Sequence, residues 1–229
     1  MIYHRIISGN VFEIFLNLQE LKCLSILTNQ KCAVIPNSIA SKYFDLSSFE
    51  IMGAVPNNSA SVDLSDCVCM FNGQLNTQSG LDLISKNSST LFRLDKFNHG
   101  NVEVRFSKPE YYKNKYIIEQ NVSVELNKQF EQKYQFISHL LPQNNLLYLN
   151  SNHFDCPFSD CHYVIENSPE NLSTIFEEKN IQAFDLKNFI TNYHSSLKEI
   201  DFQALLLILK NNFKEIYFTS DCVYKWCLV

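Results

Sequence analysis

Glycine is scarce in this sequence. Only 5 of the 229 residues are glycine, well below the roughly 7% of an average protein. Loops that bind phosphate through their backbone need glycine where the chain adopts a positive φ or closely approaches the ligand, and neither GxGxxG nor GxxxxGK[ST] occurs. The sequence therefore excludes the common nucleotide-binding fingerprints.

An excess of positive charge and a long apolar run are also missing. The net charge of −5 opposes a general affinity for nucleic acid or anionic lipid, because binding phosphates by counterion release needs many Lys and Arg on one surface. Polar residues such as Glu13, Asn17 and Lys22 interrupt the N-terminal apolar positions, so we predict neither a signal peptide nor a membrane span. We expect a cytoplasmic protein with no membrane contact.

One stretch interleaves basic and aromatic residues as single-strand nucleic-acid binders do. It runs from Arg105 to Tyr116, and Glu103, Glu110 and Glu119 dilute its charge. A solvated strand edge or loop explains this mixture better, so we do not expect nucleic-acid binding.

Eight cysteines occur without a secretion signal. Thiols stay reduced in the cytosol, and a chain of this size needs no disulfides to fold. We therefore expect most of them to fill space in the core as small apolar side chains.

The C-terminal half alternates strand and helix patterns. Short apolar runs predict strands at Leu146–Leu149, His162–Ile165, Ile181–Phe184, Ile216–Phe218 and Cys222–Leu228. Capping residues and apolar spacing predict helices at 168–180, 185–193 and 201–209. Such alternation favours an α/β or α+β fold, with helices packed on a mixed, at least partly parallel sheet.

The N-terminal half is less regular. Its pattern predicts strands at Met1–Ile7, Ala33–Ile35 and Val102–Phe106, a short helix at Ser38–Phe44, a loop at Pro56–Ser61, and either structure at Val11–Leu27. An amphipathic helix is predicted from Leu126 to Leu141, where Pro142 follows. The sequence pattern changes near residue 107, which predicts two segments, 1–107 and 108–229. A single domain is also compatible with the length.

The densest group of metal-ligating residue types lies between two predicted strands. Zinc accepts Cys sulfur and His nitrogen, so a structural site is conceivable at His153, Cys156, Cys161 and His162. The spacing opposes it, because Cys161 and His162 are adjacent and neighbours in an extended segment point to opposite faces. Cys222 and Cys227 repeat the spacing of Cys156 and Cys161, which leaves a four-cysteine site as an alternative.

Two functional hypotheses follow. The first is a protein-binding module, such as an inhibitor or an immunity or accessory protein, whose acidic surface would suit a basic protein partner. The second is an enzyme of unfamiliar type that uses the Cys and His residues of 153–162, with zinc as a conceivable cofactor. No catalytic motif decides between them, and we expect each histidine to be a surface residue or a hydrogen-bonded core residue.

Overall fold

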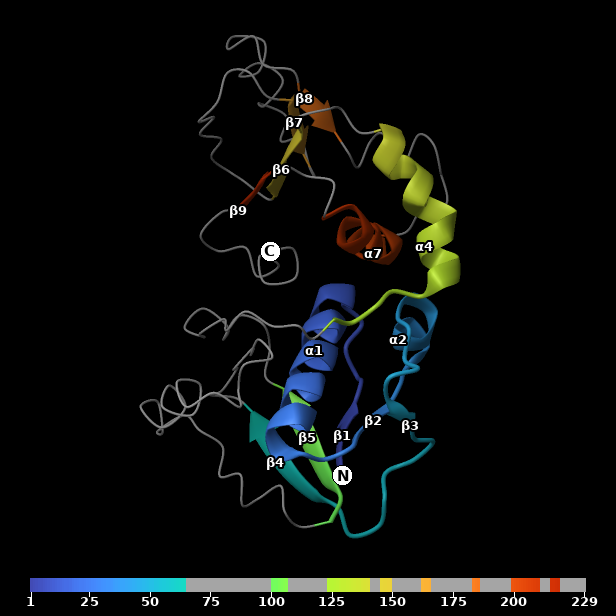
Figure 1. Ribbon diagram of the computed structural model, residues 1–229, viewed down its shortest axis with the longest axis vertical. Helices are drawn as coiled ribbons and strands as arrows, with labels where there is room; N and C mark the ends of the chain where they lie inside the picture. The colour runs from blue at the N-terminus through green and yellow to red at the C-terminus, as the bar shows by residue number, and fades with distance from the viewer. Residues whose placement is uncertain are drawn as a thin grey trace, which may run out of the picture. The chain divides into compact units, whose positions relative to one another are not determined.

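The computed structural model describes residues 1–64, 100–106, 123–140, 145–149, 162–165, 183–185, 199–210 and 215–218. The chain divides into two compact units, Met1–Asn127 and Lys128–Val229. Each unit contains its own parallel sheet, and Figure 1 labels the elements of both.

The first unit is built on a five-stranded sheet with the order β3-β2-β1-β5-β4. Every paired strand in it is parallel to its neighbour. All carboxyl ends therefore lie at one edge of the sheet, which is the usual architecture of α/β proteins. The strands are β1 (Ile2–Arg5), β2 (Cys32–Ile35), β3 (Glu50–Ile51), β4 (Ala60–Leu64) and β5 (Val102–Phe106).

The register of β1 separates an apolar side of the central sheet from a polar side. Ile2 pairs with Cys32 on one neighbour and with Val102 on the other. Side chains alternate along a strand, so Ile2 and Val102, both fully buried, share one face. The intervening position pairs Tyr3 with Glu103, and it begins the polar face that carries the candidate site.

Helix α1 (Val11–Thr28) follows β1 directly. Asn10 caps it, because the side-chain oxygen accepts hydrogen bonds from the backbone N–H groups of Phe12 and Glu13. The helix ends at Asn29, which adopts the left-handed conformation with φ 50°. Apolar residues spaced for one helical face are fully buried, but so are residues outside that stripe, including Leu16 and the polar Asn17. This burial on several sides explains why the amphipathic pattern of 11–27 is indistinct.

The cap gives a direct stability prediction. Asn10→Ala is expected to lower the free energy of unfolding by about 1 kcal/mol, because two backbone donors lose their acceptor. Asn10→Ser is the matched control, since serine retains an oxygen acceptor and should remain within a few tenths of a kcal/mol of the wild type. Urea denaturation followed by circular dichroism measures both, and equal loss in the two variants would contradict the capping role.

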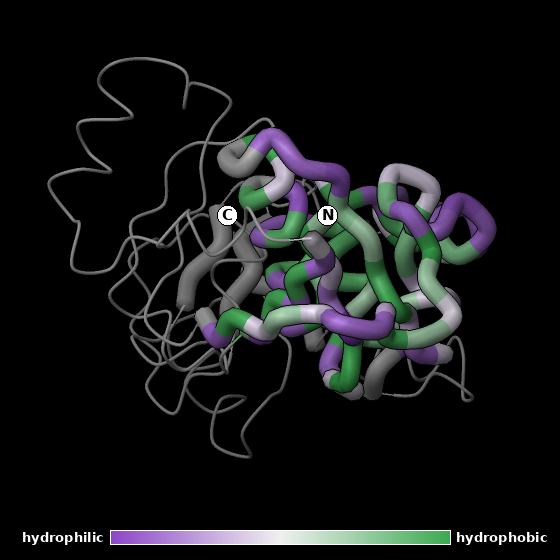
Figure 2. Tube along the Cα trace, turned by 90° about the horizontal axis from the view of Figure 1, so that it is seen from below, coloured by the Kyte–Doolittle hydropathy of each residue, from purple (hydrophilic) through white to green (hydrophobic). Residues whose placement is uncertain are grey.

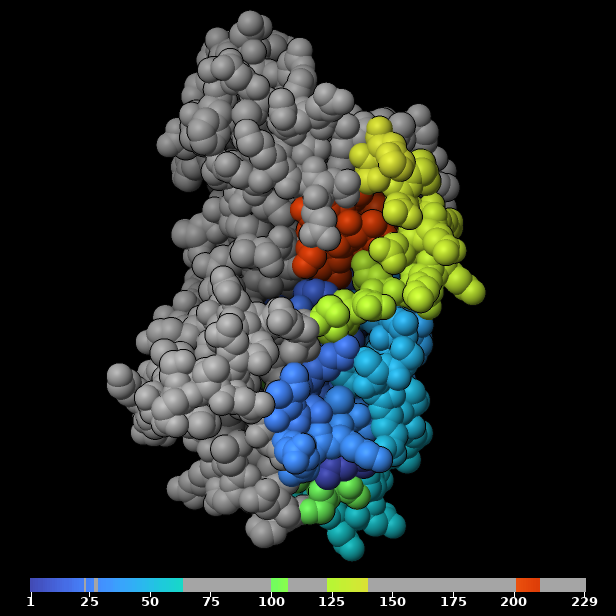
Figure 3. All heavy atoms as spheres, in the orientation of Figure 1, coloured from blue at the N-terminus to red at the C-terminus, as the bar shows by residue number. Residues whose placement is uncertain are grey.

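Residues 123–127 form the last described segment of the first unit. Helix α2 (Ser38–Tyr43) ends beside it: the Asn127 N–H donates to the Tyr43 carbonyl, and Phe44 forms an antiparallel bridge with Leu126. Lys22 of α1 donates to the Ser123 carbonyl at 2.7 Å. Figure 3 shows this segment, in yellow-green, beside the blue atoms of α1. Leu126 therefore pairs with Phe44 and does not begin the helix predicted from that residue.

The second unit has a four-stranded sheet with the order β8-β7-β6-β9, and its paired strands are also parallel. Phe202, Leu205 and Leu209 of its last described helix are at most 2% exposed. Figure 2 colours the described part of the chain by hydropathy, with hydrophobic residues in green. The elements are α4 (Lys128–Tyr134), the 3-10 helix η3 (Gln135–Leu140), β6 (Asn145–Leu149), β7 (His162–Ile165), β8 (Ala183–Asp185), α7 (Glu199–Leu209) and β9 (Glu215–Phe218).

The predicted α/β class is confirmed. β7 has the predicted bounds, and β6, β8 and β9 agree with their predicted strands to within two residues. β4 begins at Ala60, so the predicted loop at Pro56–Ser61 is too long by two residues. The helices predicted at 168–180 and 185–193 and the strand at Cys222–Leu228 lie outside the described residues, apart from Asp185 in β8. Within the described part, no helix is both long and apolar enough to cross a membrane.

Candidate functional site

The strand order of the first sheet changes direction next to β1. The chain runs outward from β1 through β2 to β3, and then continues on the other side with β4 and β5. In open parallel sheets, ligands bind outside the carboxyl ends of the strands where the order reverses. In this unit that place is the end of β1 and β5.

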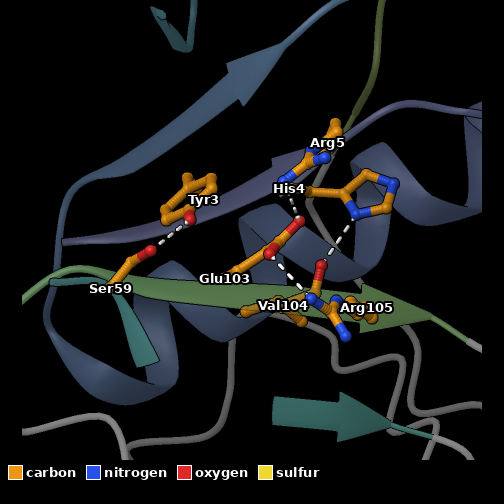
Figure 4. Close-up of polar contacts among 7 residues, drawn as sticks. All are labelled: Tyr3, His4, Arg5, Ser59, Glu103, Val104 and Arg105. Atoms are coloured by element: carbon orange, nitrogen blue, oxygen red, sulfur yellow. Dashed lines mark hydrogen bonds and ion pairs between the residues drawn. The ribbon is translucent and has the colours of Figure 1, made fainter. Parts of the chain in front are cut away.

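Two arginines and one glutamate occupy this place (Figure 4). Arg5 is the last residue of β1, and Arg105 lies near the end of β5. Their guanidinium groups approach different oxygens of one carboxylate: Arg5 Nη2 lies 3.3 Å from Glu103 Oε1, and Arg105 Nη2 lies 3.1 Å from Glu103 Oε2. Glu103 therefore holds both arginines side by side.

The three side chains differ strongly in exposure. The Glu103 side chain is 8% exposed, whereas those of Arg5 and Arg105 are 45% and 56% exposed. Each guanidinium carries five N–H donors, of which the glutamate uses few. The arrangement thus buries its negative charge and presents two positive groups with donors to spare, which suits an anion such as phosphate.

Neighbouring residues define the borders of this site. The hydroxyl of Tyr3, which pairs with Glu103, donates to Ser59 Oγ at 2.9 Å. This bond connects β1 to the residue just before β4. Asp63 on β4 is in register with Arg105 and is exposed. The negative charge of Asp63 therefore makes the β4 side of Arg105 less favourable for an anion than the side toward Arg5.

His4 precedes Arg5 in β1, and its side chain lies on the opposite face of the sheet. Its Nδ1 is 2.8 Å from the Val104 carbonyl oxygen, and its ring meets Phe106 edge-on with the ring centroids 4.8 Å apart. Burial lowers the pKa of His4 from 6.5 to about 4, against the opposing effects of the Val104 hydrogen bond and the Glu103 charge. His4 is therefore neutral at pH 7, with Nδ1 donating to Val104; its Nε2 is buried and has no hydrogen-bond partner among the residues that the structure describes.

The loop between β1 and α1 adjoins Arg5 and is held by several hydrogen bonds. The Ile6 N–H donates to the Ile35 carbonyl, and Asn37 Nδ2 donates to the Ser8 carbonyl at 2.8 Å. Ser8 Oγ donates to Glu13 Oε2 at 2.6 Å and accepts from the Asn10 N–H. These bonds tie the loop to β2, α1 and the start of α2.

The predicted metal ligands are not brought together by any described geometry. His153, Cys156 and Cys161 lie outside the described residues, as do Cys222 and Cys227. His162 is the first residue of β7, at the amino edge of the second sheet. Among the side chains that the structure describes, no group of three or more His, Cys, Asp or Glu residues is arranged to hold a metal ion. The zinc site therefore stays a prediction.

The pair of Arg5 and Arg105 was not predicted from the sequence. In the sequence, Arg105 belongs to a basic and aromatic stretch whose charge Glu103 dilutes, whereas in the structure this glutamate is the shared partner of Arg105 and Arg5. One signal was available: Glu103 and Arg105 are two residues apart in a strand, and such residues share a face. Of that stretch, only Arg105 and Phe106 belong to the described residues.

Neither a known protein family nor a curated protein matches this sequence. Among solved structures, the chain is similar to NodZ alpha-1,6-fucosyltransferase soaked with GDP-fucose, with 11% identity and a TM-score of 0.47. The match covers 100% of this chain and 92% of that one.

The solved structure found is that of a fucosyltransferase and not of an inhibitor or immunity protein, so the prediction of a protein-binding module finds no support in these comparisons. That prediction is withdrawn. Identity and TM-score at this level assign no reaction or substrate to the chain.

Proposed function

We propose that this protein is an enzyme that acts on a phosphorylated small molecule and binds the phosphate between Arg5 and Arg105. The observation that carries the proposal is the shared buried carboxylate: Glu103 holds two half-exposed guanidinium groups together at the strand ends. Arginine forks match phosphate oxygens with paired hydrogen bonds.

The position of the pair supports a substrate site. Parallel α/β sheets bind ligands beyond the carboxyl ends of their strands, beside the reversal of strand order. Arg5 and Arg105 come from the two strands that flank this reversal. Two of only three arginines in the chain are used here.

The proposed site does not depend on a glycine-rich loop. Phosphate is bound by side chains in place of backbone N–H groups, which agrees with the shortage of glycine. Two adjacent cations would also stabilise negative charge on a phosphate that departs or is transferred during a reaction. Glu103 positions the arginines and has no role in contacting the substrate.

Titration with inorganic pyrophosphate, followed by calorimetry at low ionic strength, tests the site. Arg5→Gln and Arg105→Gln are each expected to weaken binding at least about tenfold, because each removes a charge-assisted contact worth roughly 1.5 kcal/mol or more. Lys31→Gln is the matched control, because Lys31 is exposed and precedes β2 at the opposite edge of the sheet. The affinity of this variant for pyrophosphate should stay within about twofold of the wild-type value.

Two results would refute the proposal. One is wild-type affinity in both arginine variants. The other is an equal loss in Lys31→Gln, which would indicate unspecific attraction to positive charge in place of a built site.

A further inference from the structure

We infer that the ligand of this site is an organic diphosphate whose carbon-rich group packs on Ile7, next to the phosphate. The inference depends on the proposed function, since it names the class of substrate that the arginine pair binds. The feature that carries it is an apolar side chain displayed at the edge of the cationic site.

Ile7 is the most exposed large hydrophobic residue in the described part of the chain. It is 84% exposed, whereas Ile51, Ile26, Val55 and Phe136 range from 54% down to 39%. Its neighbour Ile6 is only 3% exposed. The backbone thus directs one isoleucine into the core and the next one into solvent.

Hydrogen bonds hold the loop that displays Ile7 on both sides of this residue. Backbone groups on both sides of it are bonded to other elements, since Ile6 N–H donates to Ile35 and the Ser8 carbonyl accepts from Asn37. A fixed backbone means that ligand binding would cost little ordering entropy at this position. Such preorganisation is typical of a contact surface.

Ile7 is close to Arg5 along the chain. It is two residues beyond Arg5, the last residue of β1, so it belongs to the loop that leaves the carboxyl edge where the anion is proposed to bind. A cationic pair beside an exposed apolar side chain matches a ligand with a phosphate at one end and a nonpolar face next to it. Nucleosides and short isoprenoids both have this chemistry.

Three diphosphates of similar charge separate these possibilities. Methyl diphosphate provides the anion with almost no apolar surface, ADP adds a nucleoside, and geranyl diphosphate adds an isoprenoid. At least one of the two larger compounds is expected to bind about tenfold more tightly than methyl diphosphate. Ile7→Ser should remove that advantage and leave methyl diphosphate affinity within about twofold.

Ile26→Ser is the matched control. Ile26 is 51% exposed and lies in the last turn of α1, at the end of the helix remote from Asn10, so its replacement should change none of the three affinities. Whichever of ADP and geranyl diphosphate keeps its advantage over methyl diphosphate in Ile26→Ser and loses it in Ile7→Ser identifies the organic group.

The inference is overturned if neither larger compound binds more tightly than methyl diphosphate, or if the advantage persists in Ile7→Ser. Failure of the proposed function gives a different result, because methyl diphosphate and pyrophosphate would then bind equally well to the wild type and to the arginine variants. Absence of binding by all of these compounds would refute both.

Discussion

Acidification from about pH 7 to pH 4 is expected to cost the fold about 3 kcal/mol through His4 alone. The pKa of this residue falls from 6.5 to about 4 in the folded chain, so below pH 6.5 the unfolded chain binds a proton that the folded chain resists. The contribution of His4 is complete above pH 6.5 and is lost progressively as the pH falls toward 4. Stability should therefore rise with pH across this window.

His4→Asn isolates the effect from that of other titrating groups. Asparagine is neutral at every pH and still provides an N–H donor near the Val104 carbonyl. Urea denaturation at several pH values gives the difference in unfolding free energy between wild type and variant. We expect the wild-type value minus the variant value to fall by about 3 kcal/mol between pH 7 and pH 4. A difference that is constant with pH would show that His4 does not titrate in this window.

The double variant Arg5→Gln/Arg105→Gln is expected to lose both ligand and stability. Pyrophosphate affinity should fall about a hundredfold, since two charge-assisted contacts disappear. The unfolding free energy should fall by about 2 kcal/mol, because the Glu103 carboxylate, 8% exposed, loses both ion-pair partners. This is less than for a wholly buried pair, since both arginines are half exposed.

A third substitution separates the two losses. Adding Glu103→Gln removes the buried charge, so the triple variant should recover most of the lost stability but only the small part of the lost affinity that comes from repulsion between Glu103 and the anion. Thermal denaturation and pyrophosphate calorimetry on the same preparations measure the two effects. Wild-type affinity in the triple variant would show that the arginines do not contact the anion. A double variant as stable as the wild type would show that Glu103 does not depend on the arginines.

Local sequence patterns predicted much of the fold. The run at 162–165 is short, apolar and rich in β-branched residues, and it became β7 with the predicted bounds. The apolar spacing after residue 127 did form a helix, but it tightens from α4 into a 3-10 helix at Gln135. The pattern at 11–27 was ambiguous because α1 is buried on several sides and so lacks a single apolar stripe.

Local patterns could not predict the candidate site, because its residues are far apart in the sequence of the first unit. Glu103 and Arg105 are close in sequence, but Arg5 joins them only through the pairing of Tyr3 with Glu103 in neighbouring parallel strands. Parallel pairing is non-local, and nothing in the residues near Arg5 specifies which strand will lie beside β1.

The sequence by itself determined the α/β class and most strand positions, since these depend on local spacing and turn chemistry. Only the tertiary structure decided that β1 and β5 are neighbours and that one buried carboxylate binds two arginines. The physical reason is that side-chain periodicity acts within a segment, whereas strand order and charge pairing arise from the burial of whole faces against each other.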